Sequence, residues 1–147
     1  MIQVSNAAKG LSFRDTARPI LERDLGVSLS PEVSLPIGKP PKQHKFDLVA
    51  EDQSWVLECK ALQWRENGGV PQAKITSITE AAICLRDFIH PHTRRAIILS
   101  RATHSKRRET LAEYYARLHC HNLAGLVGLV EVDPLSGSLT WLVRAAG

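Results

Sequence analysis

The sequence lacks the patterns of a membrane-spanning or secreted protein. No apolar run approaches the roughly 20 residues that a membrane-spanning helix requires. The segment Met1–Gly10 has no charged and then apolar signal-peptide pattern. The three cysteines, Cys59, Cys84 and Cys120, are scattered without a CxxC pair, which disfavours a disulfide framework or a zinc knuckle. We therefore expect a cytoplasmic protein whose cysteines are small buried hydrophobic residues.

The sequence also lacks internal repeats, low-complexity segments, and the helix-turn-helix or finger patterns that indicate base-specific DNA readout. Its 147 residues suit one domain, which we expect to span 1–147. Hydrophobic residues make up 44% and charged residues 23%, both ordinary for globular proteins. The net charge of +4 is a mild basic bias that is consistent with a nucleic-acid partner.

Hydrophobic periodicity and turn residues predict an α/β domain with the order α-β-β-β-α-β-α-β-β, in which helices flank a mixed central sheet. A first helix is expected over Ser5–Leu25, where Pro19 leaves open a kink or a later start near Thr16. A second helix carries one apolar stripe, and a third spans about Ser105–Cys120. The stripe consists of Ile75, Ile78, Ala82, Leu85 and Ile89. The expected strands are Val27–Ile37, His44–Ala50, Trp55–Leu62, Arg95–Ser100, Gly125–Val132 and Leu139–Val143.

The hairpin formed by the second and third strands carries the most informative residues. Side chains alternate along a strand, so Glu58 and Lys60 share a face. A two-residue turn at Asp52-Gln53 would place Asp47 opposite Glu58 and Lys45 opposite Lys60, although this dipeptide is not a favoured turn and the register is open to a slip. The other face is expected to be an apolar one. It would consist of Phe46, Leu48, Trp55 and Leu57.

Two facing carboxylates destabilise a sheet unless a cation lies between them. Mg²⁺ typically binds through one or two carboxylates plus substrate phosphate oxygens. Lysines beside such a cation would meet the charge of a phosphate, and Lys60 is placed to orient or deprotonate a water and to stabilise developing charge. Hydrolysis of a phosphodiester is the reaction that suits Asp47, Glu58 and Lys60 together.

These residues also resemble a family motif. Phe46-Asp47, ten intervening residues and Glu58-Cys59-Lys60 are similar to the PD-(D/E)XK nuclease signature of restriction endonucleases, Holliday-junction resolvases and repair exonucleases, with Phe46 in place of proline. The resemblance covers roughly residues 5–100 and implies a restriction-endonuclease-like core. It implies that Asp47, Glu58 and the Cys59 backbone carbonyl bind Mg²⁺ or Mn²⁺, and that Lys60 is the catalytic lysine.

Further candidates surround this motif. Many members of the superfamily carry an additional acid on the first helix, and Glu22 is preferred here over Asp15 because it lies in the more secure part of the helix. Lys74 in the second helix is expected to contact phosphate, and Lys42 and Lys45 to contact nucleic acid.

Three other features can be interpreted either as functional or as purely structural. Trp64 either stacks on nucleic acid or packs in the core. The pairs His90/His92 and His119/His121 are read as helix-end or surface histidines rather than a zinc site, and His44 is either a substrate contact or an exposed strand residue.

The sequence therefore predicts a metal-dependent nuclease that hydrolyses DNA. The alternatives are a catalytically inactive nucleic-acid-binding module on the same fold and, in a third class, a protein-interaction domain. A homodimer would suit duplex cleavage, which needs two active sites. Neither the choice between DNA and RNA nor the form of the substrate follows from these patterns.

Overall fold

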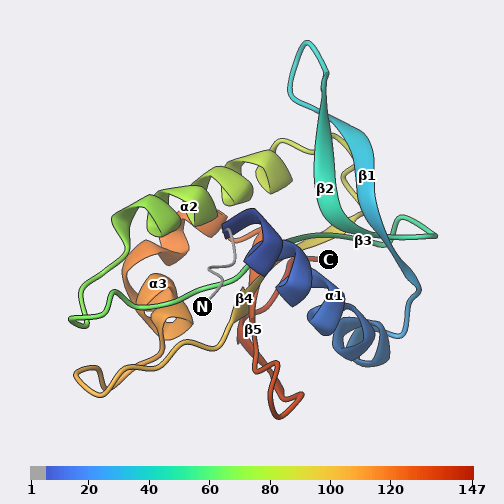
Figure 1. Ribbon diagram of the computed structural model, residues 1–147. Coiled ribbons are helices and arrows are strands. Elements are labelled where there is room, and N and C mark those ends of the chain that lie inside the picture. Colours follow the sequence, from blue (N-terminus) through green and yellow to red (C-terminus); the bar gives the residue numbers. More distant parts are fainter. Residues whose placement is uncertain (1–5) are drawn as a thin grey trace.

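The computed structural model describes residues 6–147, so Ser5, the expected first helical residue, lies outside it. Six strands, three α-helices and a short 3₁₀-helix occur in these residues, in the predicted order (Figure 1). The elements are α1 (Asn6–Leu25), β1 (Leu29–Ile37), β2 (Lys42–Ala50), β3 (Trp55–Lys60), α2 (Gln72–Arg86), β4 (Arg94–Ser100), α3 (Leu111–His119), η1 (Cys120–Leu123), β5 (Val127–Val132) and β6 (Leu139–Val143).

The strands form one mixed sheet in the order β1-β2-β3-β4-β5-β6. Strands β3, β4 and β5 are parallel, and the other neighbouring pairs are antiparallel. Helix α1 covers one face and α2 and α3 cover the other (Figure 1). The expectation of an α/β domain with a mixed sheet between helices is confirmed.

Helix α1 is continuous through Pro19, so the later start near Thr16 does not occur. It packs on the sheet through Phe13, Ala17 and Leu21, which are buried at four-residue spacing. Among residues 6–147, no helix has the length and apolar character needed to cross a membrane.

Helix α3 begins six residues later than predicted, and the basic run from 106 to 108 lies in the preceding loop. The start is fixed by a capping box, in which Thr110 Oγ1 accepts from the Glu113 N–H and the Glu113 carboxylate accepts from the Thr110 N–H. The sequence pattern predicts Leu111, Tyr114 or Tyr115, and Leu118 on the inner face of this helix. Leu111 and Tyr115 are buried, whereas Leu118 is exposed, so the prediction is wrong for Leu118.

Helix α2 packs through its predicted stripe as far as Leu85, but Ile89 lies beyond the helix and is exposed. The end of α2 is held by Arg95 of β4, a buried arginine. Its guanidinium donates to the carbonyls of Leu85 at 2.7 Å and Arg86 at 3.2 Å in the last turn of α2, and to that of Phe88 at 2.8 Å just beyond the helix.

The hairpin of β1 and β2 leaves the plane of the other strands and reaches the end of α2, where Ile37 bridges to Phe88 (Figure 1). Consequently Phe46 packs edge-on against Phe88 in the cluster under α2, whereas Leu48 packs under α1. The expected common apolar face of Phe46, Leu48, Trp55 and Leu57 is therefore wrong for Phe46, because the strand bends between Phe46 and Leu48.

All three cysteines are free. Cys59 is buried as expected, but Cys84 is half-buried and Cys120 is exposed, so the expectation of burial is wrong for Cys120.

Candidate active site at the opening between two strands

The candidate site lies where β2 separates from β3. The main-chain pairs between these strands are Leu48↔Leu57 and Val49↔Val56, which is the predicted register. Continued by one pair, this register would place Asp47 opposite Glu58. The main-chain pairing stops before that position, however, so the two strands open there.

At the opening, side chains replace the main-chain ladder. The Cys59 N–H donates to Asp47 Oδ2 at 2.7 Å, and the Asp47 N–H donates to Glu58 Oε1 at 3.3 Å. A strand residue that exchanges hydrogen bonds with a neighbour directs its N–H and C=O to the same side. Because the Cys59 N–H faces β2, its carbonyl faces the same opening as the two carboxylates. The predicted pairing of Lys45 with Lys60 does not form, and Lys45 pairs with Ser34 of β1 instead.

Glu58 is an acid in an unfavourable place for a negative charge. Only 5% of its surface is exposed. Burial and the neighbouring charge of Asp47 raise its pKa to about 8. His44 Nε2 lies 3.5 Å from Glu58 Oε1, and burial lowers the pKa of this histidine. The His44 imidazole is therefore mainly neutral near pH 7 and does little to compensate a negative charge on Glu58.

A pocket of about 240 Å³ opens beside Asp47, between the beginnings of α1 and α2. Lys60 from β3 and Lys74 from α2 line it, as does Arg14 from α1. Burial and the nearby charge of Lys60 lower the pKa of Lys74. The structure therefore brings Asp47, Lys60 and Lys74 to one place, with Glu58 buried behind Asp47.

Arg14 is the residue of this pocket that sequence reasoning missed. It is 9% exposed, and its Nε and Nη2 donate to Asp15 Oδ1. Its Nη1 is buried and has no hydrogen-bond partner among the described residues; Glu32 Oε1 is 3.7 Å away. A signal was present, because Arg14 precedes Ala17 and Leu21 at helical spacing and so occupies an inward position of α1.

The remaining predicted residues lie elsewhere. Glu22 accepts a hydrogen bond from the Leu29 N–H at 2.9 Å and lies 3.9 Å from Arg18, so it anchors the start of β1. Asp15 is exposed and bound to Arg14. Neither acid lines the pocket beside Asp47. Lys42 and Lys45 are exposed on β2 and do not line it either.

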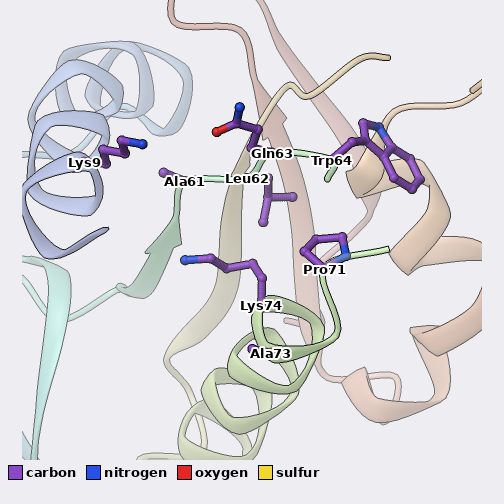
Figure 2. Close-up of a pocket in the computed structure, with 8 residues that line it drawn as sticks. All are labelled: Lys9, Ala61, Leu62, Gln63, Trp64, Pro71, Ala73 and Lys74. Atoms are coloured by element: carbon purple, nitrogen blue, oxygen red, sulfur yellow. The ribbon is translucent and has the colours of Figure 1, made fainter. Parts of the chain in front are cut away.

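A second hollow of about 330 Å³ adjoins the pocket. Lys9 from α1 and Lys74 from α2 extend into it from two different sides, and Gln63 lies on the loop that follows β3 (Figure 2). Trp64 is 3% exposed at its edge, and its indole N–H donates to the Ala102 carbonyl at 3.0 Å. Of the two readings of Trp64, the structure favours packing, because little of its ring is accessible to a base.

Within residues 6–147 no group of three or more His, Cys, Asp or Glu side chains is arranged to hold a metal ion. A cation beside Asp47 would therefore take two carboxylates, with the Cys59 carbonyl, water or substrate oxygens completing the shell. Such a donor set suits Mg²⁺, which is commonly bound by one or two carboxylates and retains several waters.

Comparisons of the chain with protein families, with curated proteins and with solved structures give no match. The chemistry of the site is therefore the basis for assigning a function to this chain.

Proposed function

We propose that this chain is a metal-dependent nuclease that hydrolyses phosphodiester bonds in DNA. The observation that carries the proposal is the meeting of Asp47 and Glu58 at the opening between β2 and β3, with Lys60 beside them. A carboxylate pair with one buried member is costly to a fold. A cation-binding role is a reason for retaining such a pair.

The residues at the opening fit a divalent cation. Asp47, Glu58 and the Cys59 carbonyl are hard oxygen donors, and a cation between them would offset the repulsion that raises the pKa of Glu58. Bound there, Mg²⁺ or Mn²⁺ would polarise the scissile phosphate and lower the pKa of a coordinated water.

The cationic side chains of the pocket supply the rest of the chemistry. Arg14 and Lys74 would bind the non-bridging oxygens of the phosphate and fix its orientation. Lys60 would hold the attacking water and stabilise the charge that develops on the phosphate.

The proposal includes membership of the PD-(D/E)XK superfamily. The support is the order of elements, a helix and three strands followed by a helix and a strand, together with the location of the two motif halves on adjacent strands. The acid on α1 departs from the superfamily expectation, since Glu22 and Asp15 lie outside the pocket. The α1 residue at the site is a cation, Arg14.

A catalytically inactive nucleic-acid-binding module is the second candidate. It is favoured by the fact that both carboxylates already have protein partners, the Cys59 N–H for Asp47 and the Asp47 N–H for Glu58. Such a site is held together without a cation. A binding module would retain DNA in EDTA and would show no turnover.

The test is cleavage of a panel of linear, circular, single-stranded and branched DNA, with RNA alongside, in Mg²⁺ or Mn²⁺ and in EDTA. Cutting that needs the cation supports the nuclease. Binding without cutting on every substrate supports the module instead. Sedimentation of the active species shows whether it is the homodimer that duplex cleavage would suit.

A further inference from the structure

Three adjoining hollows form one groove that begins at the carboxylate pair and follows the loop after β3. The pocket beside Asp47 shares Ala61 and Lys74 with the second hollow. The second hollow shares Leu62, Gln63 and Trp64 with a third, of about 370 Å³. The groove therefore extends along the loop and away from the site on one side.

Cationic side chains line the whole groove. They come from α1, β3, α2 and the loops that follow β3 and β4, so residues distant in sequence meet on one surface. From the site outward they are Arg14, Lys60, Lys74, Lys9, Arg65 and Arg101. Glu66 also lines the far hollow, where its carboxylate offsets one of these charges. A series of cations at successive positions suits an extended polyanion rather than a single small anion.

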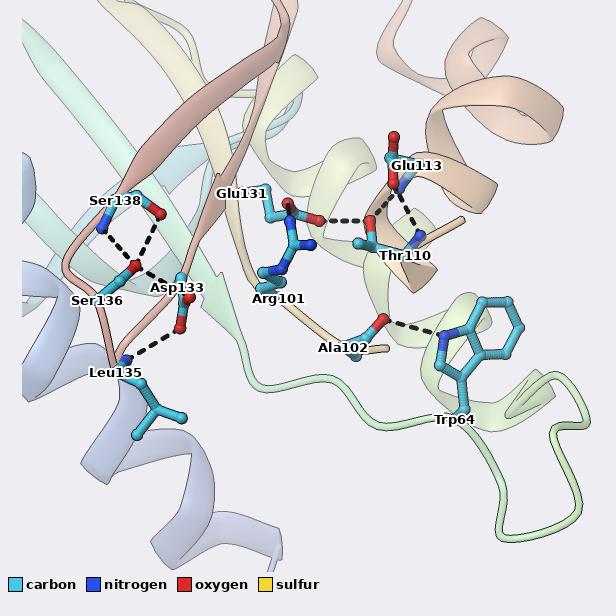
Figure 3. Close-up of polar contacts among 10 residues, drawn as sticks. All are labelled: Trp64, Arg101, Ala102, Thr110, Glu113, Glu131, Asp133, Leu135, Ser136 and Ser138. Carbon is cyan, nitrogen blue, oxygen red and sulfur yellow. Dashed lines mark hydrogen bonds and ion pairs between the residues drawn. The ribbon is translucent and has the colours of Figure 1, made fainter. Parts of the chain in front are cut away.

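The walls of the far half are fixed in place by contacts between two loops. Besides the bond from Trp64 to the Ala102 carbonyl, Arg107 Nε donates to the Gly68 carbonyl at 2.8 Å, and the Arg107 guanidinium lies 4.3 Å from the centre of the Trp64 ring (Figure 3 shows the Trp64 bond). The two loops therefore need little ordering when a ligand binds, which lowers the entropic cost of binding.

Arg101 is anchored at the same edge. Its Nη1 lies 3.3 Å from Glu131 Oε1, and the buried Glu131 also accepts a hydrogen bond from Thr110 at the start of α3 (Figure 3). The Arg101 side chain remains half-exposed and lines the groove from the loop that follows β4. Arg65, in contrast, is exposed and makes no side-chain hydrogen bond or ion pair with the described residues.

At the other end of the groove, Arg14 Nη1 is buried and has no hydrogen-bond partner among residues 6–147, the nearest carboxylate oxygen being Glu32 Oε1 at 3.7 Å. A buried hydrogen-bond donor without a partner destabilises the protein, because it has lost its contacts with water. A phosphate oxygen in the adjoining pocket would satisfy it.

We infer that the groove binds the sugar-phosphate backbone of the DNA strand that is cut, over several phosphates on one side of the scissile bond. The inference rests on the proposed function and adds the course of the substrate across the protein. Trp64 is not available for stacking on bases, so contacts to phosphates dominate. Binding along the groove is therefore independent of base sequence and sensitive to salt.

The experiment measures binding of labelled DNA oligonucleotides to the Lys60→Ala protein in Mg²⁺, over a range of salt concentrations. The Lys60→Ala change prevents cutting during the measurement. Lys9→Ala/Arg65→Ala in this background removes two exposed groove cations. The control variant, Arg23→Ala/Arg144→Ala, removes two exposed cations far from the groove. Arg144 lines a hollow where β3 and β4 begin, which is the end of these strands opposite the site. Arg23 is next to Asp24, which lines the same hollow.

The groove variant should bind at least about tenfold more weakly at low salt, and the slope of log K against log salt should shrink by about 0.7 to 0.9 for each lost contact. The control variant should bind like its parent. Equal affinity and slope for groove and control variants would overturn the groove while leaving the nuclease intact. If the wild-type protein neither binds nor cuts any nucleic acid, the proposed function itself fails.

A second measurement locates the contacts. Oligonucleotides that carry one neutral methylphosphonate each, at successive positions, should bind more weakly when the neutral position lies on one side of the cut. In Arg65→Ala, the loss of affinity caused by the neutral group at one of these positions should disappear, because the ion pair between Arg65 and that phosphate is already absent. Penalties that are the same in the two proteins at every position would contradict a contact between Arg65 and a phosphate.

Discussion

The carboxylate of Asp47 accepts a hydrogen bond from the Cys59 N–H at 2.7 Å, at the position where β2 leaves β3. In the register of this hairpin, Cys59 would face Phe46. The side chain of Asp47 thus takes the place of a main-chain acceptor and keeps the opening between the strands in a defined shape. The arrangement sets a carboxylate and a strand carbonyl side by side at the point where β2 bends away from β3.

If this opening binds a cation, Mg²⁺ or Mn²⁺ should raise the melting temperature of the protein. Binding to the folded state alone adds about 2.7 kcal/mol at a concentration one hundred times the dissociation constant. Asp47→Asn should abolish the shift, whereas Asp52→Asn, a matched change in the exposed turn, should keep it. A shift of the same size in Asp47→Asn would place the cation elsewhere.

The metal-free protein should lose stability as the pH rises from about 4.5 to about 8. Glu58 has its pKa raised to about 8 by burial and by Asp47, from 4.5 in the unfolded chain. The folded state therefore binds the proton more tightly, so this contribution is complete below pH 4.5 and is lost through pH 8, by about 1.4 kcal/mol per pH unit at most.

Denaturant unfolding in EDTA at several pH values measures this effect. Glu58→Gln should flatten the dependence relative to wild type, and Glu80→Gln, a matched change at an exposed position of α2, should leave it unchanged. An unaltered pH profile in Glu58→Gln would show that Glu58 ionises normally in the folded protein.

Arg95 should be important for stability and not for chemistry. Its buried guanidinium satisfies carbonyls at the end of α2, and the positive charge is favourable at a helix C-terminus. Arg95→Leu leaves these carbonyls without their donor and should lower the free energy of unfolding by roughly 2–4 kcal/mol. Arg94→Ala, which removes an exposed arginine stacked on Trp55, should cost less than about 1 kcal/mol. Comparable costs for the two variants would contradict this role.

Arg14→Met should reduce kcat/KM for DNA cleavage by about ten- to a hundredfold, since a charged hydrogen bond to phosphate is lost. The metal-induced rise in melting temperature should remain, because Arg14 is not a cation ligand. Arg14→Lys keeps the charge and should recover part of the activity. Unchanged cleavage by Arg14→Met, with only a loss of stability, would restrict Arg14 to packing α1 on the sheet.

Local patterns were sufficient to predict the order of the elements and the position of the motif. Alternation along β3 predicts Glu58 and Lys60 on the face of Val56, which packs in the cluster under α2, whereas Leu57 and Cys59 pack in the cluster under α1. The predicted register is confirmed by the pair Leu48↔Leu57, but the two-residue turn at Asp52-Gln53 is wrong, because four residues join the strands and the Gln53 N–H donates to the Ala50 carbonyl.

Long-range contacts decided the features that local patterns missed. The bend that turns Phe46 toward α2 depends on its packing against Phe88, which is 42 positions later in the chain. Glu22 is as helical as predicted, but its carboxylate is engaged by the start of β1. Arg14 reaches the site only because α1 crosses the sheet beside the opening. Periodicity shows that a side chain points inward, and it does not show what the side chain will meet.

The most direct test compares Lys60→Ala with wild type on the DNA substrate that wild type cuts best, under single-turnover conditions in Mg²⁺, with Arg23→Ala as a matched control. We predict that Lys60→Ala folds and binds the cation like wild type but cuts at least about a hundredfold more slowly, because the side chain that orients the water and stabilises the developing charge is gone. Arg23→Ala should cut at the wild-type rate. Cleavage by Lys60→Ala at the wild-type rate would contradict the assignment of the active site to the opening between β2 and β3.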